Sequence, residues 1–175
     1  MKHILDEADN NINFDRYATY VETIKAKLPL HVYDFASNPE LYNLSSKSSL
    51  HDAWLEHITI SEPSSGERNE IRKLEIEMVL LGPHHDRTIK LKYMGVSKYN
   101  LGSPARPGEP RFTHTAHGDL HTHEIRLSSS GLIEHELLFE RGTSFLIECE
   151  DLKHCLLYTS PSPRDLSTSR MPSSA

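Results

Sequence analysis

Four of the 12 histidines lie close together in one segment, at His114, His117, His121 and His123. In an extended strand, residues two apart point to the same face, so the rings of His121 and His123 can reach one metal ion. His117 or His114 would supply a third nitrogen from the preceding loop. Three protein ligands leave a fourth position for water, as in catalytic zinc sites. The spacing therefore predicts a candidate site for a divalent transition metal such as zinc.

The same pattern has two other interpretations. His121 and His123 share their strand face with Ile125 and Leu127, which is typical of half-buried sheet residues with hydrogen-bonded rings. A pH-responsive surface is the third interpretation, because protonation of all 12 histidines would change the formal net charge from −6 to +6. Ordinary sheet packing is the leading interpretation, so no cofactor is expected.

Other residues that could do chemistry give weaker signals. In the segment His84–Asp86, the aspartate could orient a histidine for metal binding or base catalysis, and His51 next to Asp52 could form a similar dyad. Polar turns and loops are the leading interpretation of both pairs. The chain has no Gly-x-Ser-x-Gly, Walker-type or Gly-x-Gly-x-x-Gly motif, and carboxylates flank Cys149, which disfavours its thiolate. We therefore expect no catalytic residue and a protein that is not an enzyme.

The elements that must position these residues follow from the hydrophobic pattern. Apolar residues at three- and four-residue steps predict an amphipathic helix over residues 14–28, ended by Pro29, and a short helical turn begins at Pro39. Beyond residue 50 the period changes to two. This pattern predicts six strands with turns between them, over residues 54–60, 71–81, 87–96, 120–127, 132–140 and 144–149. We expect an α+β domain, an antiparallel β-meander of about six strands with the N-terminal helix on one face.

The domain organisation is predicted to be simple. Residues 1–13 form a flexible N-terminus, residues 14–154 form one domain, and residues 155–175 form a disordered tail rich in serine and proline. This tail resembles a translated sequencing adapter, which would make it non-native and place the natural C-terminus beyond about His154. Without Arg164, Asp165 and Arg170, residues 1–154 hold 17 basic and 24 acidic residues, a formal net charge of −7.

Charge and hydropathy narrow the class of partner. The whole chain has 19 Lys and Arg residues against 25 Asp and Glu residues, which argues against general binding to nucleic acid or to an anionic membrane. No apolar run approaches the roughly 20 residues of a membrane-spanning helix, and the acidic N-terminus lacks the apolar stretch of a secretory signal. We expect a cytoplasmic protein.

Five short segments combine strand and turn patterns: Ser49–Glu56, Leu81–Arg87, His117–His121, His135–Phe139 and Leu146–Leu152. They resemble segments of small uncharacterised bacterial proteins, some of which are similar to immunity proteins of toxin systems. The resemblance implies a β-rich module that binds another protein, for which a basic toxin domain would suit the acidic charge. The expected surface is the acidic side of the last strands with the turn at His84–Asp86. Our leading hypothesis is a non-enzymatic protein-binding module, and the alternative is a metal-binding protein or metal-dependent enzyme that uses the histidine cluster.

Overall fold

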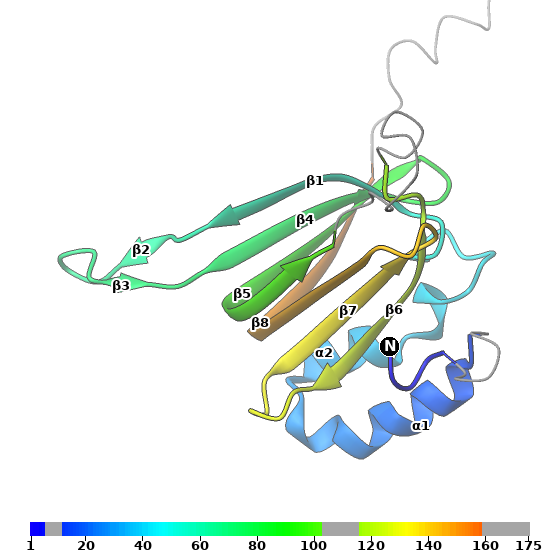
Figure 1. Cartoon of the computed structure of the whole chain (residues 1–175), viewed down its shortest axis with the longest axis horizontal. Coiled ribbons are helices and arrows are strands. Elements are labelled where there is room, and N and C mark those ends of the chain that lie inside the picture. The colour runs from blue at the N-terminus through cyan, green and yellow to red at the C-terminus, as the bar shows by residue number, and fades with distance from the viewer. Residues whose placement is uncertain (6–11, 103–115, 159–175) are drawn as a thin grey trace, which may run out of the picture.

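The computed structural model describes residues 1–5, 12–102 and 116–158, and it confirms the α+β prediction (Figure 1). Two helices pack with a six-stranded antiparallel sheet in the order β1-β4-β5-β8-β7-β6. The strands of this sheet are β1 (Trp54–Ser61), β4 (Glu75–Leu81), β5 (Arg87–Leu101), β6 (Leu120–Leu127), β7 (Ile133–Phe139) and β8 (Ser144–Tyr158). The order is not that of a simple meander, because β8 lies between β5 and β7.

The helices occupy the N-terminal part of the chain. Helix α1 (Phe14–Ile24) is capped by Asn13, whose side chain accepts a hydrogen bond from the N–H of Arg16 at 3.0 Å, and a 3₁₀ turn, η1 (Lys25–Lys27), follows it. Pro29 ends this helical run as expected, but it also precedes a second helix, α2 (Leu30–Ser37), that the sequence analysis did not predict. The expected turn at Pro39 is η2 (Pro39–Leu41).

The sheet bends where its two long strands change partners. Residues 88–94 of β5 pair with β4 on one side and with β8 on the other. Strand β7 pairs only with residues 144–149 of β8. A register shift between Val96 and Lys98 marks the bend. Gly95 has φ +61°, a left-handed backbone conformation that favours glycine at this position. Helix α2 packs against β8, where His31 pairs with Asp151 at 2.6 Å.

Two short strands extend the sheet away from the helices. Strands β2 (Ser64–Ser65) and β3 (Ile71–Arg72) pair with each other at the tip of a ribbon that continues from β1 and β4 (Figure 1). Strand β1 is one edge of the six-stranded sheet, and β6 is the opposite edge.

The other edge strand, β6, is covered by tyrosine hydroxyls from α1. The hydroxyl of Tyr17 accepts a hydrogen bond from the N–H of Ile125 at 2.9 Å, and that of Tyr20 accepts one from the N–H of Leu127 at 3.1 Å. These bonds satisfy backbone donors that an edge strand otherwise leaves open to pairing with another molecule. The helix therefore holds β6, the strand of the predicted histidine site.

Two expected boundaries differ from the structure. Residues 1–5 are packed rather than flexible: Ile4 is fully buried, and three backbone N–H groups of this segment bind Glu124. At the other end, residues 155–158 belong to β8 and pair with residues 87–90 of β5. Residues 159–175 lie outside the described residues. Within the described chain, the helices are all too short or too polar to cross a bilayer.

Candidate functional site

The structure places the described histidines of the predicted metal site in different surroundings. A register shift between Leu120 and Thr122 interrupts β6 at its start. His123 is 1% exposed and faces the core, whereas His121 is half-buried with its ring 5.8 Å from that of His51. The two side chains line one small cavity, but this cavity has room for about one water molecule.

The remaining two predicted ligands do not complete a site in the described structure. The ring of His117 lies against Phe139 and Phe145, at centroid distances of 5.3 Å and 5.0 Å, and its Nδ1 has no partner among the described residues. His114 lies outside the described residues. Metal binding by these histidines stays a prediction, which elemental analysis of the purified protein would test.

Three buried aromatic groups form a hydrogen-bonded chain that the sequence analysis did not foresee. The hydroxyl of Tyr93 lies 2.8 Å from Nδ1 of His135, and Nε2 of His135 lies 3.2 Å from Nδ1 of His123. All three residues are 0–1% exposed. Burial, helped by the charge of Arg126, lowers the pKa of His135 to about 3. Burial and the neighbouring His135 also hold the pKa of His123 well below its usual value, so both rings are neutral at pH 7.

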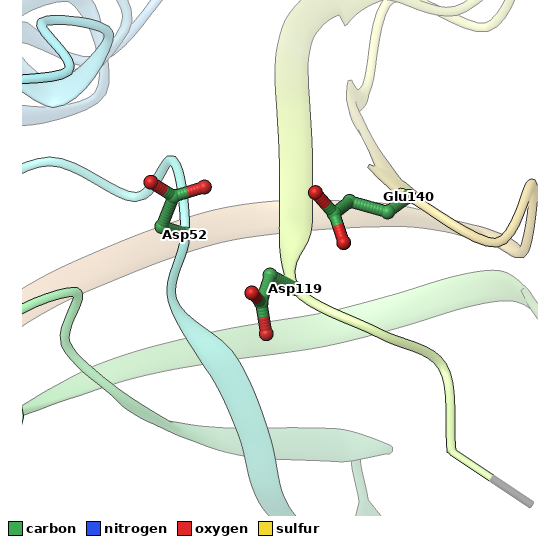
Figure 2. Close-up of side chains that lie close together, drawn as sticks. All are labelled: Asp52, Asp119 and Glu140. Carbon is green, nitrogen blue, oxygen red and sulfur yellow. The ribbon is translucent and has the colours of Figure 1, made fainter.

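A carboxylate cluster lies at the end of the sheet where β1 begins (Figure 2). One oxygen each from Asp52, Asp119 and Glu140 lie within 4.8 Å of one another. Asp52 and Glu140 are exposed, and Asp119 is half-buried. Backbone bonds hold the three segments together: the N–H of Asp52 donates to Leu120, and the N–H of Glu140 donates to Asp119, each at 2.9 Å.

This cluster creates a concentrated negative field. Carboxylate oxygens are suited to hard cations such as Ca²⁺ and Mg²⁺, and the same field attracts the lysine and arginine side chains of a partner. Among the described residues it is the only group of three acidic, histidine or cysteine side chains with such spacing, and no histidine belongs to it. No local motif could have predicted it, because its members come from three distant segments.

The two histidine–aspartate pairs behave differently. His51 Nδ1 lies 2.7 Å from Oδ1 of Asp52, so this contact forms as the sequence suggested. Asp86 instead contacts Arg87, with Nε–Oδ1 at 2.8 Å and a second bond at 3.0 Å, so its carboxylate is engaged by a guanidinium.

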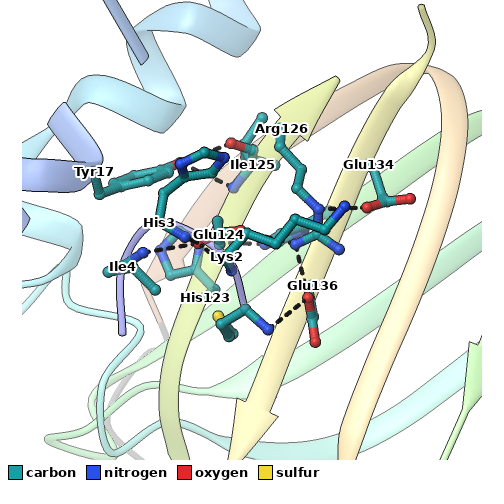
Figure 3. Close-up of polar contacts among 12 residues, drawn as sticks. Lys2, His3, Ile4, Tyr17, His123, Glu124, Ile125, Arg126, Glu134 and Glu136 are labelled. Carbon is teal, nitrogen blue, oxygen red and sulfur yellow. Dashed lines mark hydrogen bonds and ion pairs between the residues drawn. The ribbon is translucent and has the colours of Figure 1, made fainter. Parts of the chain in front are cut away.

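Arg126 is the centre of a nearly buried ionic network (Figure 3). Its guanidinium lies 2.8 Å from Glu124 and 2.7 Å from Glu136, and its Nε contacts Glu134. The α-amino group of Met1 also pairs with Glu136, at 3.0 Å. Burial raises the pKa of Glu124, but backbone N–H groups and Arg126 outweigh this effect and hold it below its usual value. The network fixes the first residues of the chain against β6 and β7.

The acidic side chains of the last strands therefore do not form a free patch. Each has a partner: Glu134 and Glu136 contact Arg126, Glu148 accepts from Ser97 at 2.6 Å, Glu150 pairs with Lys73 at 2.5 Å, and Asp151 pairs with His31 at 2.6 Å. These contacts disfavour the last strands as the main surface for a basic partner.

A different surface lies along β1. Trp54 at the start of this strand, Ile60 near its end and Ile71 on β3 are 44%, 42% and 51% exposed. Among the described residues, β1 pairs with β4 alone, and the other edge of its backbone has no strand beside it. Trp54 is stacked on His85 of the β4–β5 turn, with ring centroids 4.8 Å apart. We call Trp54, Ile60, Ile71 and the outer edge of β1 the β1 surface.

The comparisons with known proteins give no family for this chain. No protein-family model matches it, and no curated protein matches it.

Proposed function

We propose that the protein is a non-enzymatic binding module that recognises a basic partner protein through the β1 surface. The observation that carries this proposal is an edge strand that has no strand beside its outer edge among the described residues and that exposes Trp54 and Ile60. Proteins usually protect such edges with charges, bulges or a covering element, because an open edge invites pairing with another chain. Here β6 is covered by α1, whereas β1 has a bulge between Leu55 and His57 and the exposed Glu56, but no described strand lies beside its outer edge.

The side chains of the β1 surface suit a protein partner. Trp54 and the isoleucines Ile60 and Ile71 leave apolar area in contact with water, and its removal on binding is favourable. Tryptophan in particular is enriched among residues that dominate binding energy. A partner that adds an extended segment beside β1 would gain main-chain hydrogen bonds as well as these apolar contacts.

The charge of the chain supports a basic partner. Residues 1–154 carry a formal net charge of −7. The exposed Glu56 lies on β1 itself, and the carboxylates of Asp52, Asp119 and Glu140 cluster next to its first residue. Complementary charge accelerates association and favours the correct partner. A basic toxin domain, as the immunity-like resemblance implies, is the partner class that we propose.

The test is a matched set of surface variants. The double variant Trp54→Ser/Ile60→Thr removes two exposed apolar side chains, and Tyr99→Ser, 43% exposed on β5, is the control. Proteins from the source cells are captured on the immobilised wild-type chain, and each captured protein is purified and titrated by calorimetry. We expect a basic protein whose affinity falls at least about ten-fold with the double variant, about 1.4 kcal/mol, and is unchanged by the control. Equal affinity for all three chains would contradict the proposal.

A further inference from the structure

Three imidazole rings lie beneath one aromatic side chain of α2. The ring centroid of Phe35 is 5.4 Å from that of His123, 5.8 Å from His135 and 4.9 Å from His154. These histidines come from β6, β7 and β8, so a single buried side chain connects α2 to three strands. We call these four residues the Phe35 cluster.

The hydrogen-bond chain has no place for an additional proton. When the Tyr93 hydroxyl donates to His135, the other ring nitrogen of His135 donates to His123, and each neutral ring carries one proton. Nε2 of His123 then holds its proton without a partner, and Nε2 of His154 is also buried and unpartnered among the described residues. A charged ring would lack a compensating carboxylate at either position.

The neighbouring tyrosines and the thiol of Cys149 supply no negative charge that would stabilise a protonated ring. From β5 the hydroxyl of Tyr93 faces it, and Tyr42, after η2, stacks on His123 with centroids 4.4 Å apart. Burial raises the pKa of both tyrosines, so they stay neutral. The thiol of Cys149 on β8 also stays neutral, because burial raises its pKa to about 12.

The charged groups nearby are engaged or exposed. Glu124 on β6 binds residues 2–4 and Arg126, whose positive charge further disfavours a charged His135. On the side of α2, His31 pairs with Asp151 at 2.6 Å, and Asp34 is exposed. Lys153 next to His154 is a cation, which cannot stabilise an imidazolium.

We propose that the Phe35 cluster is an acid-operated latch, in which proton uptake by its histidines releases α2 from the sheet while the sheet remains folded. The proton comes from solvent. On His123 or His135 it must bind Nδ1, which accepts a hydrogen bond in the closed state, and a charged His154 has a buried Nε2–H without an acceptor among the described residues. Release of α2 gives the charged rings access to water and exposes the apolar face of the helix, Val32, Phe35 and Ala36. The backbone pairing between β4 and β5 involves no residue of α2, so this ladder can survive the opening.

The direction of the pH dependence follows from the neutral rings. Burial lowers the pKa of His135 to about 3 and that of His154 to about 4, below the value of about 6.5 in an open chain. The closed state is therefore fully favoured above pH 6.5 and loses stability as the pH falls below it. If opening restores the pKa of His135 from about 3 to about 6.5, the ratio of open to closed molecules rises about 25-fold between pH 7 and pH 5 through this group; the rise is smaller if Arg126 still lowers the pKa in the open state.

Hydrogen exchange measured by mass spectrometry tests the latch. The wild-type chain is compared between pH 7 and pH 4.5, with exchange rates corrected for the intrinsic effect of pH. We expect Leu30–Ser37 to lose protection at a higher pH than Glu75–Leu81. Simultaneous loss in both segments would show global unfolding and would overturn the proposal, as would protection of α2 that does not change with pH.

Two variants assign the effect to the cluster. In His154→Gln, one proton-binding ring is replaced by a neutral polar side chain, so α2 should open at a lower pH than in the wild type. His57→Gln, at an exposed position on β1, is the control and should open at the wild-type pH. The same opening pH in His154→Gln and wild type would overturn the role of the cluster. If His154→Gln does not fold, the latch is tested by the wild-type exchange of Leu30–Ser37 and Glu75–Leu81 alone.

Discussion

Replacement of Glu124 by glutamine should be far more destabilising than the same change at the surface. Glu124 is fully buried and accepts hydrogen bonds from the N–H groups of Lys2, His3 and Ile4 at 2.7–3.1 Å. Its other oxygen binds Arg126 at 2.8 Å. A glutamine has one acceptor oxygen, so its NH₂ group must face either these backbone donors or the guanidinium.

The magnitude follows from what stays buried. Loss of one member of a buried ion pair typically costs about 3–5 kcal/mol, because the remaining charge lacks compensation. Arg126 retains Glu134 and Glu136, which places Glu124→Gln at the lower end, about 3 kcal/mol. For a chain of this size, that loss lowers the melting temperature by roughly 6–12 °C.

The assay is urea unfolding followed by circular dichroism, with Glu77→Gln as the control. Glu77 pairs with Lys90 at 3.1 Å, but both side chains are about one third exposed, so its loss should cost about 0–1 kcal/mol. Hydrogen exchange at His3 and Ile4 should also accelerate in Glu124→Gln. Equal unfolding free energies of the two variants, within about 0.5 kcal/mol, would refute the reasoning about buried charge.

Three further predictions concern single groups. Because burial holds the pKa of His135 at about 3, acidification from pH 7 to pH 5 should lower the unfolding free energy by about 2 kcal/mol through this group. Urea titration at each pH measures this loss, and a stability that does not fall would contradict a neutral buried ring. Burial raises the pKa of Cys149 to about 12, so a thiol reagent at pH 8 should rapidly label only the exposed Cys155 of the native chain. Rapid labelling of both cysteines would show that β8 is open. Gly95→Ala should destabilise the fold by about 1–3 kcal/mol, because its φ is +61° and the new methyl group meets Glu150; wild-type stability on thermal melting would place the bend elsewhere.

Most of the secondary structure could be predicted from local patterns. The alternation of period two found the six strands of the main sheet, and the helical period found α1 with its end near Pro29. Helix α2 was missed because it is short and begins directly after the proline that ends the preceding helical run. The pairing of β5 with β8 was also missed, since their contact joins segments more than 40 residues apart that no local pattern relates.

The candidate site was less predictable for the same reason. His51 and Asp52 are neighbours in sequence, and their contact could be anticipated. The chain from Tyr93 through His135 to His123 depends on the register of four strands, and the carboxylate cluster depends on three separate loops. The exposure of Trp54 was also unforeseen, because a tryptophan in a strand pattern favours a place in the core.

The most direct test of the proposed binding function is a hydrogen-exchange footprint of the complex. The protein is mixed with the purified basic partner, and amide exchange is compared with that of the free chain. The account predicts slower exchange at Trp54–Ser61, because the partner covers the outer edge of β1, and little change along β6. Unchanged exchange in β1 together with protection elsewhere on the molecule would contradict the β1 surface as the binding site.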